Sequence, residues 1–294
     1  MAEALQVPMK ATFWSIMERR VKECNAFGAR DIEVLNFGVS GYGTAQELLT
    51  LRHRVSDYAP DMVVLAFYPG NDVRNNSREL EEMKLRPFFR LENGALVLDD
   101  GFLSDPEYLS YRRNFGVRNM LFDLRTFQLL RRTKVAIEQL TGKEARSPQV
   151  ANLELGLDEE IFLPPTSAAW RDAWGVTERL IVKMRDEVTG MGARFLLVSI
   201  PIAIQANPDP KVREQFARGL GANDLLYPES RLGTLADKEK IDVALLAAPF
   251  QSYAETNRVY LHGFTNTALG SGHLNENGHR LAGDLVSDHI CGSR

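Results

Sequence analysis

The sequence is poor in cysteine: its 294 residues include only Cys24 and Cys291, which lie near opposite ends of the chain and form no CxxC pair. A disulfide framework and a structural zinc site are therefore not expected. A bond between these two cysteines requires the two ends of the chain to meet, and the sequence alone leaves that open.

Long apolar runs and an excess of one charge are also missing. No stretch approaches the roughly twenty apolar residues that cross a bilayer, and the net charge is −4 without a strongly basic block. The charge therefore gives no case for a nucleic acid or an anionic membrane as partner. The opening residues have neither the basic start nor the apolar core of a signal peptide. Taken literally, this start predicts a cytoplasmic protein.

What the sequence does contain is a series of short apolar runs separated by helical patterns. Four runs are rich in Val, Leu and Ile and barely alternate, which is typical of parallel strands covered on both faces. They cover residues 32–37, 62–67, 194–200 and 242–248. Alternation with helices predicts a parallel sheet with helices on both faces.

The helical patterns carry recognisable start and stop signals. We expect Gly28 as the C-cap of the first helix, Thr44 as the N-cap of the second and Asn275 as the N-cap of the last. The four helical patterns cover residues 11–28, 44–60, 167–192 and 275–290.

A long block interrupts the alternation after the second apolar run. Residues 87–100 predict a β-hairpin with Asn93-Gly94 as its turn, and a helical stretch follows near residues 119–140. The block is too long for a simple loop. We therefore expect one domain over residues 1–294 with a subdomain inserted at about residues 78–165, lying over an edge of the sheet as a lid.

Three motifs stand where chemistry is expected in such a sheet. "NFGVSGYGT" (residues 36–44) and "YPGNDVRNN" (residues 68–76) each follow an apolar run, and "GSGHLNENGH" (residues 270–279) precedes the last helix. The carboxyl ends of parallel strands share one edge, so the first two motifs should meet there with the histidine segment nearby.

These motifs supply what acyl transfer needs. A backbone N–H on a tight glycine turn and an asparagine amide can both point at a developing oxyanion, and a histidine beside them can act as general base. Each motif also has a plainer explanation. A glycine turn can be simple geometry or a phosphate cradle, "GND" is a common turn sequence, and a lone histidine is more often structural.

Taken together, the motifs "NFGVSGYGT", "PGND" and "GHLNENGH" resemble the second, third and fifth conserved blocks of the SGNH, or GDSL, hydrolases. The resemblance implies a three-layer α/β/α, flavodoxin-like fold and a serine that attacks an ester. It also implies that Gly41 and Asn71 are oxyanion-hole donors and that His273 is the base that activates the serine. No metal or organic cofactor is implied.

The block that normally carries the serine, Gly-Asp-Ser at the end of the central strand, is missing ahead of the first apolar run. We interpret the sequence as truncated at its start, so that the nucleophile and the first central strand are absent and a longer form could be exported or membrane-anchored. Ser40 and Ser271 are poor substitutes, because a triad is defined by geometry. The hydroxyl of Ser40 is expected to bond within its own turn.

The acid that orients the histidine is also unidentified. The family usually has Asp three residues before this histidine, where this sequence has Gly270. A backbone carbonyl or a remote acid could orient the imidazole, or the site could work as a Ser–His dyad. Asp72 is expected to hold the Asn71 turn. His279 is interpreted as structural, and His262 as a weaker candidate for the wall of the site.

The sequence thus predicts an esterase of the SGNH type that acts on an acylated carbohydrate, a lipid or a small ester. A second hypothesis is a remnant or binding module that keeps the pocket and lacks the nucleophile. A third hypothesis is a flavodoxin-like nucleotide binder that uses the turn at residues 38–43 for phosphate, but the turn has neither a Walker lysine nor GxGxxG spacing.

Overall fold

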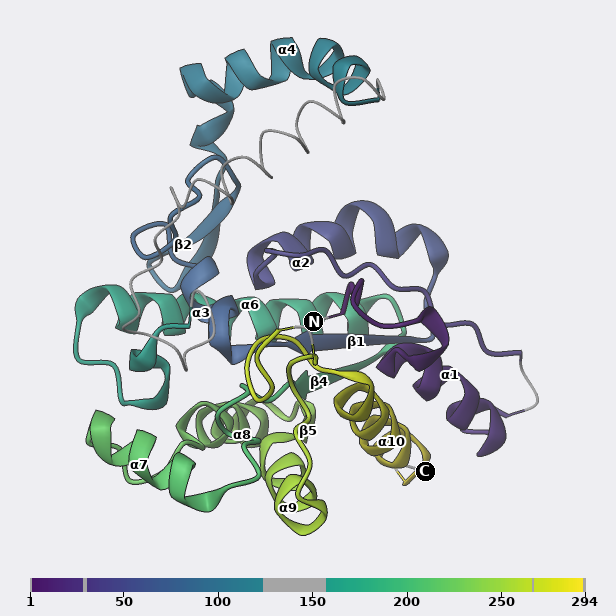
Figure 1. The fold of residues 1–294 in the computed structure, drawn as a ribbon. Coiled ribbons are helices and arrows are strands. Elements are labelled where there is room, and N and C mark those ends of the chain that lie inside the picture. The colour runs from purple at the N-terminus through teal and green to yellow at the C-terminus, as the bar shows by residue number, and fades with distance from the viewer. Residues whose placement is uncertain (1, 29–30, 124–156, 266, 293–294) are drawn as a thin grey trace.

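A computed structural model describes residues 2–28, 31–123, 157–265 and 267–292 of the chain (Figure 1). The structural findings below refer to these residues. The predicted helix near residues 119–140 and the polar connection after it lie largely outside them.

The centre of the molecule is a parallel three-stranded sheet in the order β1-β4-β5. The strands span Met62–Phe67 (β1), Arg194–Ser199 (β4) and Asp242–Leu245 (β5). In the register, Phe67 lies opposite Ser199, so β1 and β4 end together. Three of the four predicted strands are thereby confirmed, and the chain has the predicted α/β fold class.

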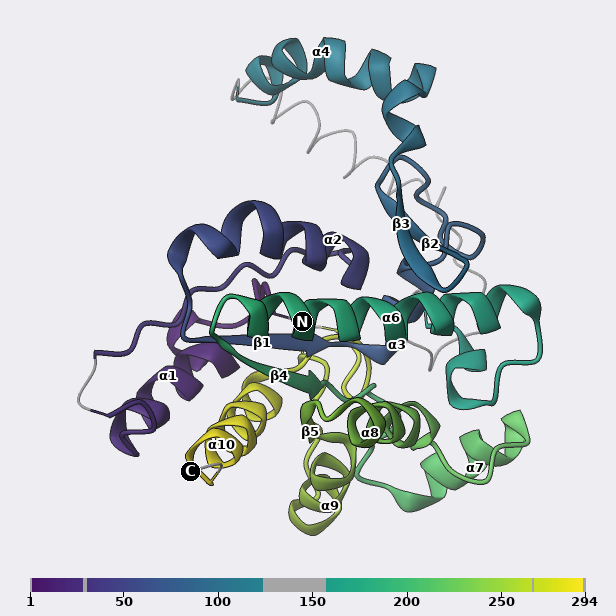
Figure 2. The same cartoon turned by 180° about the vertical axis from the view of Figure 1, so that it is seen from behind.

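Helices cover both faces of this sheet. Figures 1 and 2 show α6 and α8 on one side, and α1 beside α10 on the other. Helix α6 connects β1 to β4, and α8 connects β4 to β5. Connections between parallel strands are right-handed, and both of these run in the same direction across the sheet, so their helices lie on the same face. The helices are α1 (Phe13–Glu23), α2 (Thr44–Thr50), α3 (Pro69–Asn75), α4 (Pro106–Asp123), α6 (Ala168–Gly190), α7 (Pro210–Leu220), α8 (Tyr227–Glu239), α9 (Ala247–Asn257) and α10 (Glu276–Gly292).

The first apolar run, residues 32–37, is not a strand, and this prediction is wrong. The segment has strand composition, but it makes no ladder with β1 or any other described strand. A strand exists only through hydrogen bonds to a neighbouring strand. Local composition can therefore make a segment suitable for a sheet without placing a partner beside it.

Two of the predicted helix caps are also wrong. Helix α2 begins one residue earlier than expected, because Gly43 is its N-cap and the Gln46 side chain accepts a hydrogen bond from the Gly43 N–H at 3.0 Å. Helix α1 ends at Glu23 and its C-cap is Cys24, four residues before the expected cap Gly28. At α10 the expectation is confirmed, since Asn275 Oδ1 accepts from the N–H groups of Asn277 and Gly278.

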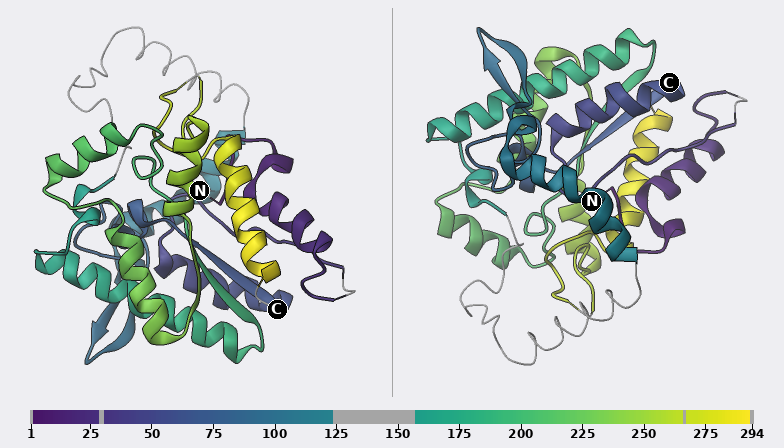
Figure 3. Two further views of the ribbon diagram at one scale, coloured as in Figure 1. Left: turned by 90° about the horizontal axis from the view of Figure 1, so that it is seen from below. Right: turned by 90° about the horizontal axis from the view of Figure 1, so that it is seen from above.

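The predicted hairpin is present as β2 (Phe88–Glu92) and β3 (Ala95–Asp99). Its turn, Asn93-Gly94, has positive φ at both residues, 51° and 79°, as a type I′ turn requires. The hairpin packs on α2 and α6. Figure 1 shows α4 extending away from the body of the molecule, and in the view from above in Figure 3 this helix crosses over the body. The boundaries of the inserted subdomain and its role as a lid remain predictions.

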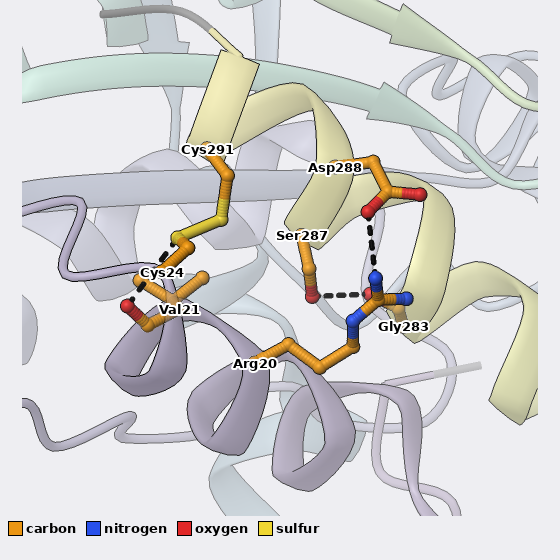
Figure 4. Close-up of a disulfide and its surroundings, with 7 residues drawn as sticks. All are labelled: Arg20, Val21, Cys24, Gly283, Ser287, Asp288 and Cys291. Carbon is orange, nitrogen blue, oxygen red and sulfur yellow. Dashed lines mark hydrogen bonds and ion pairs between the residues drawn. A yellow bond between two sulfur atoms is a disulfide. The ribbon is translucent and has the colours of Figure 1, made fainter.

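The two cysteines meet, which settles the question that the sequence left open. Cys24 at the end of α1 and Cys291 in the last turn of α10 form a disulfide with a Cα–Cα distance of 6.1 Å (Figure 4). Arg20 of α1 binds Asp284 and Asp288 of α10 at 2.7 and 2.8 Å. Disulfides of this kind persist in oxidising compartments. The disulfide thus joins α1 and α10 at the C-terminal ends of both helices.

Among the described helices, none is long and apolar enough to cross a membrane.

Candidate functional site

The glycine turn and the asparagine motif lie against each other at the carboxyl end of β1. A Cβ on Gly43 would lie 2.8 Å from Asn75 Cβ and 3.0 Å from Asn76 Oδ1, so only glycine allows the approach. The Ala45 N–H also donates to Asn76 Oδ1 at 2.9 Å. The first two motifs therefore meet at the carboxyl end of β1, as expected, although the residues before the first motif form no strand.

Asn71 lies in the first turn of α3, and Asp72 closes this turn. Asp72 Oδ2 accepts from the Tyr68 N–H at 2.7 Å, which confirms the expected positioning role of Asp72. In the orientation that satisfies its neighbours, the Asn75 amide accepts from Asn71 Nδ2 at 2.9 Å and donates to Asn71 O at 3.2 Å. An amide nitrogen carries two hydrogens, so Asn71 keeps one for a further acceptor.

Gly41 has a positive φ of 78° and is exposed. Its carbonyl oxygen accepts from the Arg86 guanidinium at 2.7 Å, and Arg86 also binds the side chains of Gln46 and Glu81. The N–H of Gly41 has no acceptor within the part of the chain that the structure describes. Arg86 thus holds the turn through the carbonyl oxygen of Gly41. The N–H of Gly41 remains available as a donor.

His273 is held near the same edge by contacts of its loop with the end of β4. The Gly263 N–H donates to His273 O at 2.9 Å, and Leu274 forms an antiparallel bridge with His262. His262 in turn bonds through Nε2 to Pro201 O at 3.1 Å, two residues beyond β4. Figure 1 shows this loop in yellow before α10.

The pKa of His273 is lowered by partial burial of its imidazole, although the residue as a whole is exposed. A lowered pKa keeps the ring neutral at neutral pH, which is the state that a general base requires.

His262 and His279 are buried, and burial lowers the pKa of each to about 4. His279 accepts a hydrogen bond from the Phe13 N–H and stacks on the Phe13 ring, so it has the expected structural role.

A buried polar network supports the His273 side of the site. Glu229 of α8 accepts from Ser199 Oγ at 3.1 Å and from Gln205 Nε2 at 2.7 Å, and Gln205 Oε1 accepts from the Ile202 N–H at 2.7 Å. Burial raises the pKa of Glu229 to about 7. The network fixes the turn after β4, and this turn carries the Pro201 carbonyl that binds His262.

The start of the described chain lies on the glycine turn. Ala2 O accepts from Asn36 Nδ2 at 2.8 Å, and a Cβ on Gly38 would lie 2.6 Å from Ala2 Cβ. Glu3 accepts from the Ser40 N–H at 2.8 Å, and hydrogen bonding to Ser40 lowers the pKa of Glu3. No hydrogen bond of the Ser40 hydroxyl within its own turn is found among the described residues, so that expectation is not confirmed.

The segments that carry the three predicted site residues lie toward the carboxyl ends of β1 and β4, but no hydrogen bond among the described residues joins Gly41, Asn71 and His273. Among the described residues, His273 makes no hydrogen bond to Gly41 or Asn71, and no described serine hydroxyl bonds to His273. The hydroxyl of Ser271 donates to Ala268 O instead.

A cavity adjoins the edge and is lined by Ala2 and by residues 31–38, but none of the three site residues lines it. No described group of three or more His, Cys, Asp or Glu side chains could hold a metal ion.

Several residues of the edge are not predicted from the sequence. Arg86 and Glu81 hold the glycine turn and Asn75, and both come from the inserted block. Glu47 is also not predicted. Its carboxyl group neighbours that of Asp72, and burial raises the pKa of both groups, that of Asp72 to about 7. No local pattern marks a charged residue that becomes buried only through tertiary contacts.

Substituting Gly43 by alanine tests the contact between the two motifs. The backbone at Gly43 has φ −108° and ψ 178°, which any residue adopts, so the new methyl group acts only through its clash with Asn75. We expect a loss of about 1–3 kcal/mol of unfolding free energy, as for an overpacked core, measured by chemical denaturation. Gly190→Ala, which meets open space at the end of α6, is the matched control. Equal stability of both variants would contradict the packing described here.

Comparisons with protein-family models and with curated proteins find no match. Among solved structures, the chain resembles the crystal structure of an acetyl xylan esterase, AlAXEase, at 14% sequence identity and a TM-score of 0.46. The alignment covers 97% of this chain and 92% of that protein. A likeness of this degree assigns neither the fold nor the activity of that protein to this chain.

Proposed function

We propose that the edge formed by Gly41, Asn71 and His273 is the acyl-transfer site of an ester hydrolase of the SGNH type. What supports the proposal is the contact of the glycine turn with α3, because it brings the segments that carry Gly41 and Asn71 together at the carboxyl end of β1. Two such donors are the usual means of stabilising a carbonyl oxygen as it becomes negative, and each is worth about a hundredfold or more in rate.

The reaction needs a serine, and no described serine hydroxyl bonds to His273. Ala2 lies against Gly38, and consecutive Cα atoms are about 3.8 Å apart, so a serine-bearing segment joined to the start of the chain would reach the same edge. The serine oxygen would attack the ester carbonyl while His273 takes its proton. His273 would then give this proton to the leaving alcohol, and water would release the acyl group by the reverse sequence. An acylated carbohydrate, a lipid or a small ester is the proposed substrate.

The residues as described favour a second candidate for the chain on its own. Because no described serine bonds to His273, the 294-residue chain could bind and polarise an ester without cleaving it. That candidate is a binding module with the same oxyanion donors and no nucleophile.

Labelling with a fluorophosphonate probe separates the two candidates. The chain of residues 1–294 is expected to remain unlabelled, and a form extended ahead of Met1 by an apolar strand that ends in Gly-Asp-Ser is expected to be labelled and to hydrolyse p-nitrophenyl acetate. The matched control is the same extension ending in Gly-Asp-Ala. Stoichiometric labelling of the unextended chain would show that a serine within residues 1–294 is the nucleophile and would overturn the proposal.

A further inference from the structure

A buried ion pair contacts both the glycine turn and the asparagine motif. Arg86 and Glu81 come from the segment between α3 and β2, they are 8% and 6% exposed, and Arg86 Nη1 lies 3.6 Å from Glu81 Oε2. Burying two charges carries a large desolvation cost, and an apolar pair of similar volume is often as stable. Stability alone therefore does not account for this pair, and the contacts of its two side chains indicate a second role.

Arg86 holds the glycine turn at two points. Its Nη2 donates to Gly41 O at 2.7 Å and also to Gln46 Oε1. Gln46 Oε1 in turn accepts from the Gly43 N–H at 3.0 Å. The planar guanidinium is suited to two acceptors that lie side by side. It therefore fixes Gly41 directly and Gly43 through Gln46.

The turn itself does not use the N–H of Gly41. The Tyr42 N–H donates to Val39 O at 3.2 Å and closes a β-turn over residues 39–42. Gly41 is the third residue of this turn and has a φ of 78°, as a type II turn requires. The N–H of Gly41 belongs to the central peptide group, which takes no part in the bond that closes the turn. Its direction therefore depends on how the turn is held from outside, and Arg86 provides a buried contact of that kind.

Glu81 determines which way the Asn75 amide faces. Glu81 Oε2 accepts from Asn75 Nδ2 at 2.5 Å, and Glu81 Oε1 accepts from the Met83 N–H at 2.8 Å. An ionised carboxylate only accepts, so the Asn75 nitrogen faces Glu81 and the Asn75 oxygen faces Asn71. That oxygen accepts from Asn71 Nδ2 at 2.9 Å. One hydrogen of the Asn71 amide is thereby fixed, which also fixes the direction of the other.

We propose that Arg86 and Glu81 are positioning residues, which hold the two oxyanion donors in one arrangement through the continuous chain Gly41–Arg86–Glu81–Asn75–Asn71. The proposal rests on the function proposed above for Gly41 and Asn71. Arg86 and Glu81 act on the reaction only through the directions of the two donor hydrogens. Their substitution should therefore lower turnover without weakening the binding of the ester.

Nuclear magnetic resonance of residues 1–294 tests the coupling without requiring activity. Glu81→Gln keeps the shape of the side chain but adds an amide that can donate, so the Asn75 amide can turn and Asn71 can lose its acceptor. We expect the side-chain amide resonances of Asn71 to shift. They should also shift in Arg86→Lys, although no hydrogen bond among the described residues joins Arg86 to Asn71. The side-chain amide of Asn257, which donates to a backbone carbonyl within α9, is the internal reference.

Turnover in a form of the protein that hydrolyses esters gives the second readout. The kcat is taken per active site titrated with a fluorophosphonate probe, so that unfolded protein does not count. Glu81→Gln and Arg86→Lys are each expected to lower kcat by about tenfold to a hundredfold with KM unchanged, because misplacing a catalytic group by about 1 Å has a cost of this order. Arg52→Lys is the matched control, since Arg52 lies beyond the end of α2, pairs with Glu187 at 2.7 Å and should leave kcat unchanged.

A double-mutant cycle separates positioning from a general structural role. Glu81 is proposed to act on Asn71 through Asn75, so Glu81→Gln should cost less in kcat when Asn71 is already alanine. A purely structural role of Glu81 predicts the same fold loss in both backgrounds.

Three outcomes would overturn the proposal. They are unchanged Asn71 resonances in both variants, an unchanged kcat per active site in both variants, and an equal fold loss for Glu81→Gln with and without Asn71. Arg86→Lys keeps the positive charge beside Glu81 and decides the case if Glu81→Gln does not fold. If the resonances shift as expected and no form of the protein hydrolyses esters, the two donors are coupled and the function proposed above is wrong.

Discussion

In a form of the protein that hydrolyses esters, replacing His273 by alanine is expected to lower kcat/KM by about a hundredfold to ten-thousandfold, the usual contribution of a general base. The imidazole is proposed to remove the serine proton and to deliver it to the leaving alcohol, so both half-reactions depend on it. Asn71→Ala is expected to cost about a hundredfold to a thousandfold, as for loss of one oxyanion donor. Both effects would be measured with p-nitrophenyl acetate.

The other histidines give matched controls for this experiment. His53→Ala removes an exposed imidazole on the helical turn after α2 and should leave kcat/KM unchanged. His279→Ala removes the acceptor of the Phe13 N–H and should lower stability more than activity at a temperature where the protein stays folded. Undiminished hydrolysis by the His273 variant would remove His273 from the mechanism.

The pH profile gives a second readout of the same role. A base acts only when it is neutral, and partial burial lowers the pKa of His273. The acid limb of kcat/KM should therefore lie below pH 6.5, the ordinary value for an exposed histidine. An acid limb above that value would point to a different base.

The second large effect is expected when the disulfide is removed. The Cys24→Ser, Cys291→Ser double variant should lose about 2–5 kcal/mol of unfolding free energy, because the bond restrains the unfolded chain over a separation of 267 residues. The measurement is chemical denaturation of the oxidised protein and of the double variant under identical conditions.

The expected loss is large because of what the bond joins. Helices α1 and α10 pack so closely that a Cβ on Gly283 would lie 2.7 Å from Ile16 Cβ, and both helices contribute to the lining of the cavity beside β1. The control is Asp288→Asn, which removes a solvent-exposed ion pair with Arg20 that is worth at most about 1 kcal/mol. If the double variant were as stable as this control, the disulfide would not be a stabilising clamp.

The parts of the fold that the sequence determined depend on neighbours in the chain. The run at residues 62–67 became β1 with the predicted bounds, and Asn93-Gly94 formed the expected type I′ turn, because both depend on local composition and backbone preference. The glycines of the turn at residues 38–43 pointed to a close approach, and Gly43 does approach α3. These patterns also placed the candidate site at the strand ends.

Tertiary structure decided the features that depend on distant partners. Residues 32–37 carry strand composition and form no strand, because strand pairing needs a second backbone beside them. Cys24 and Cys291 form a bond only because α1 packs on α10. Arg86 binds Gly41 across 45 residues of sequence. Hydrogen bonds, disulfides and buried ion pairs join atoms that folding brings together, and no local pattern specifies which residues those will be.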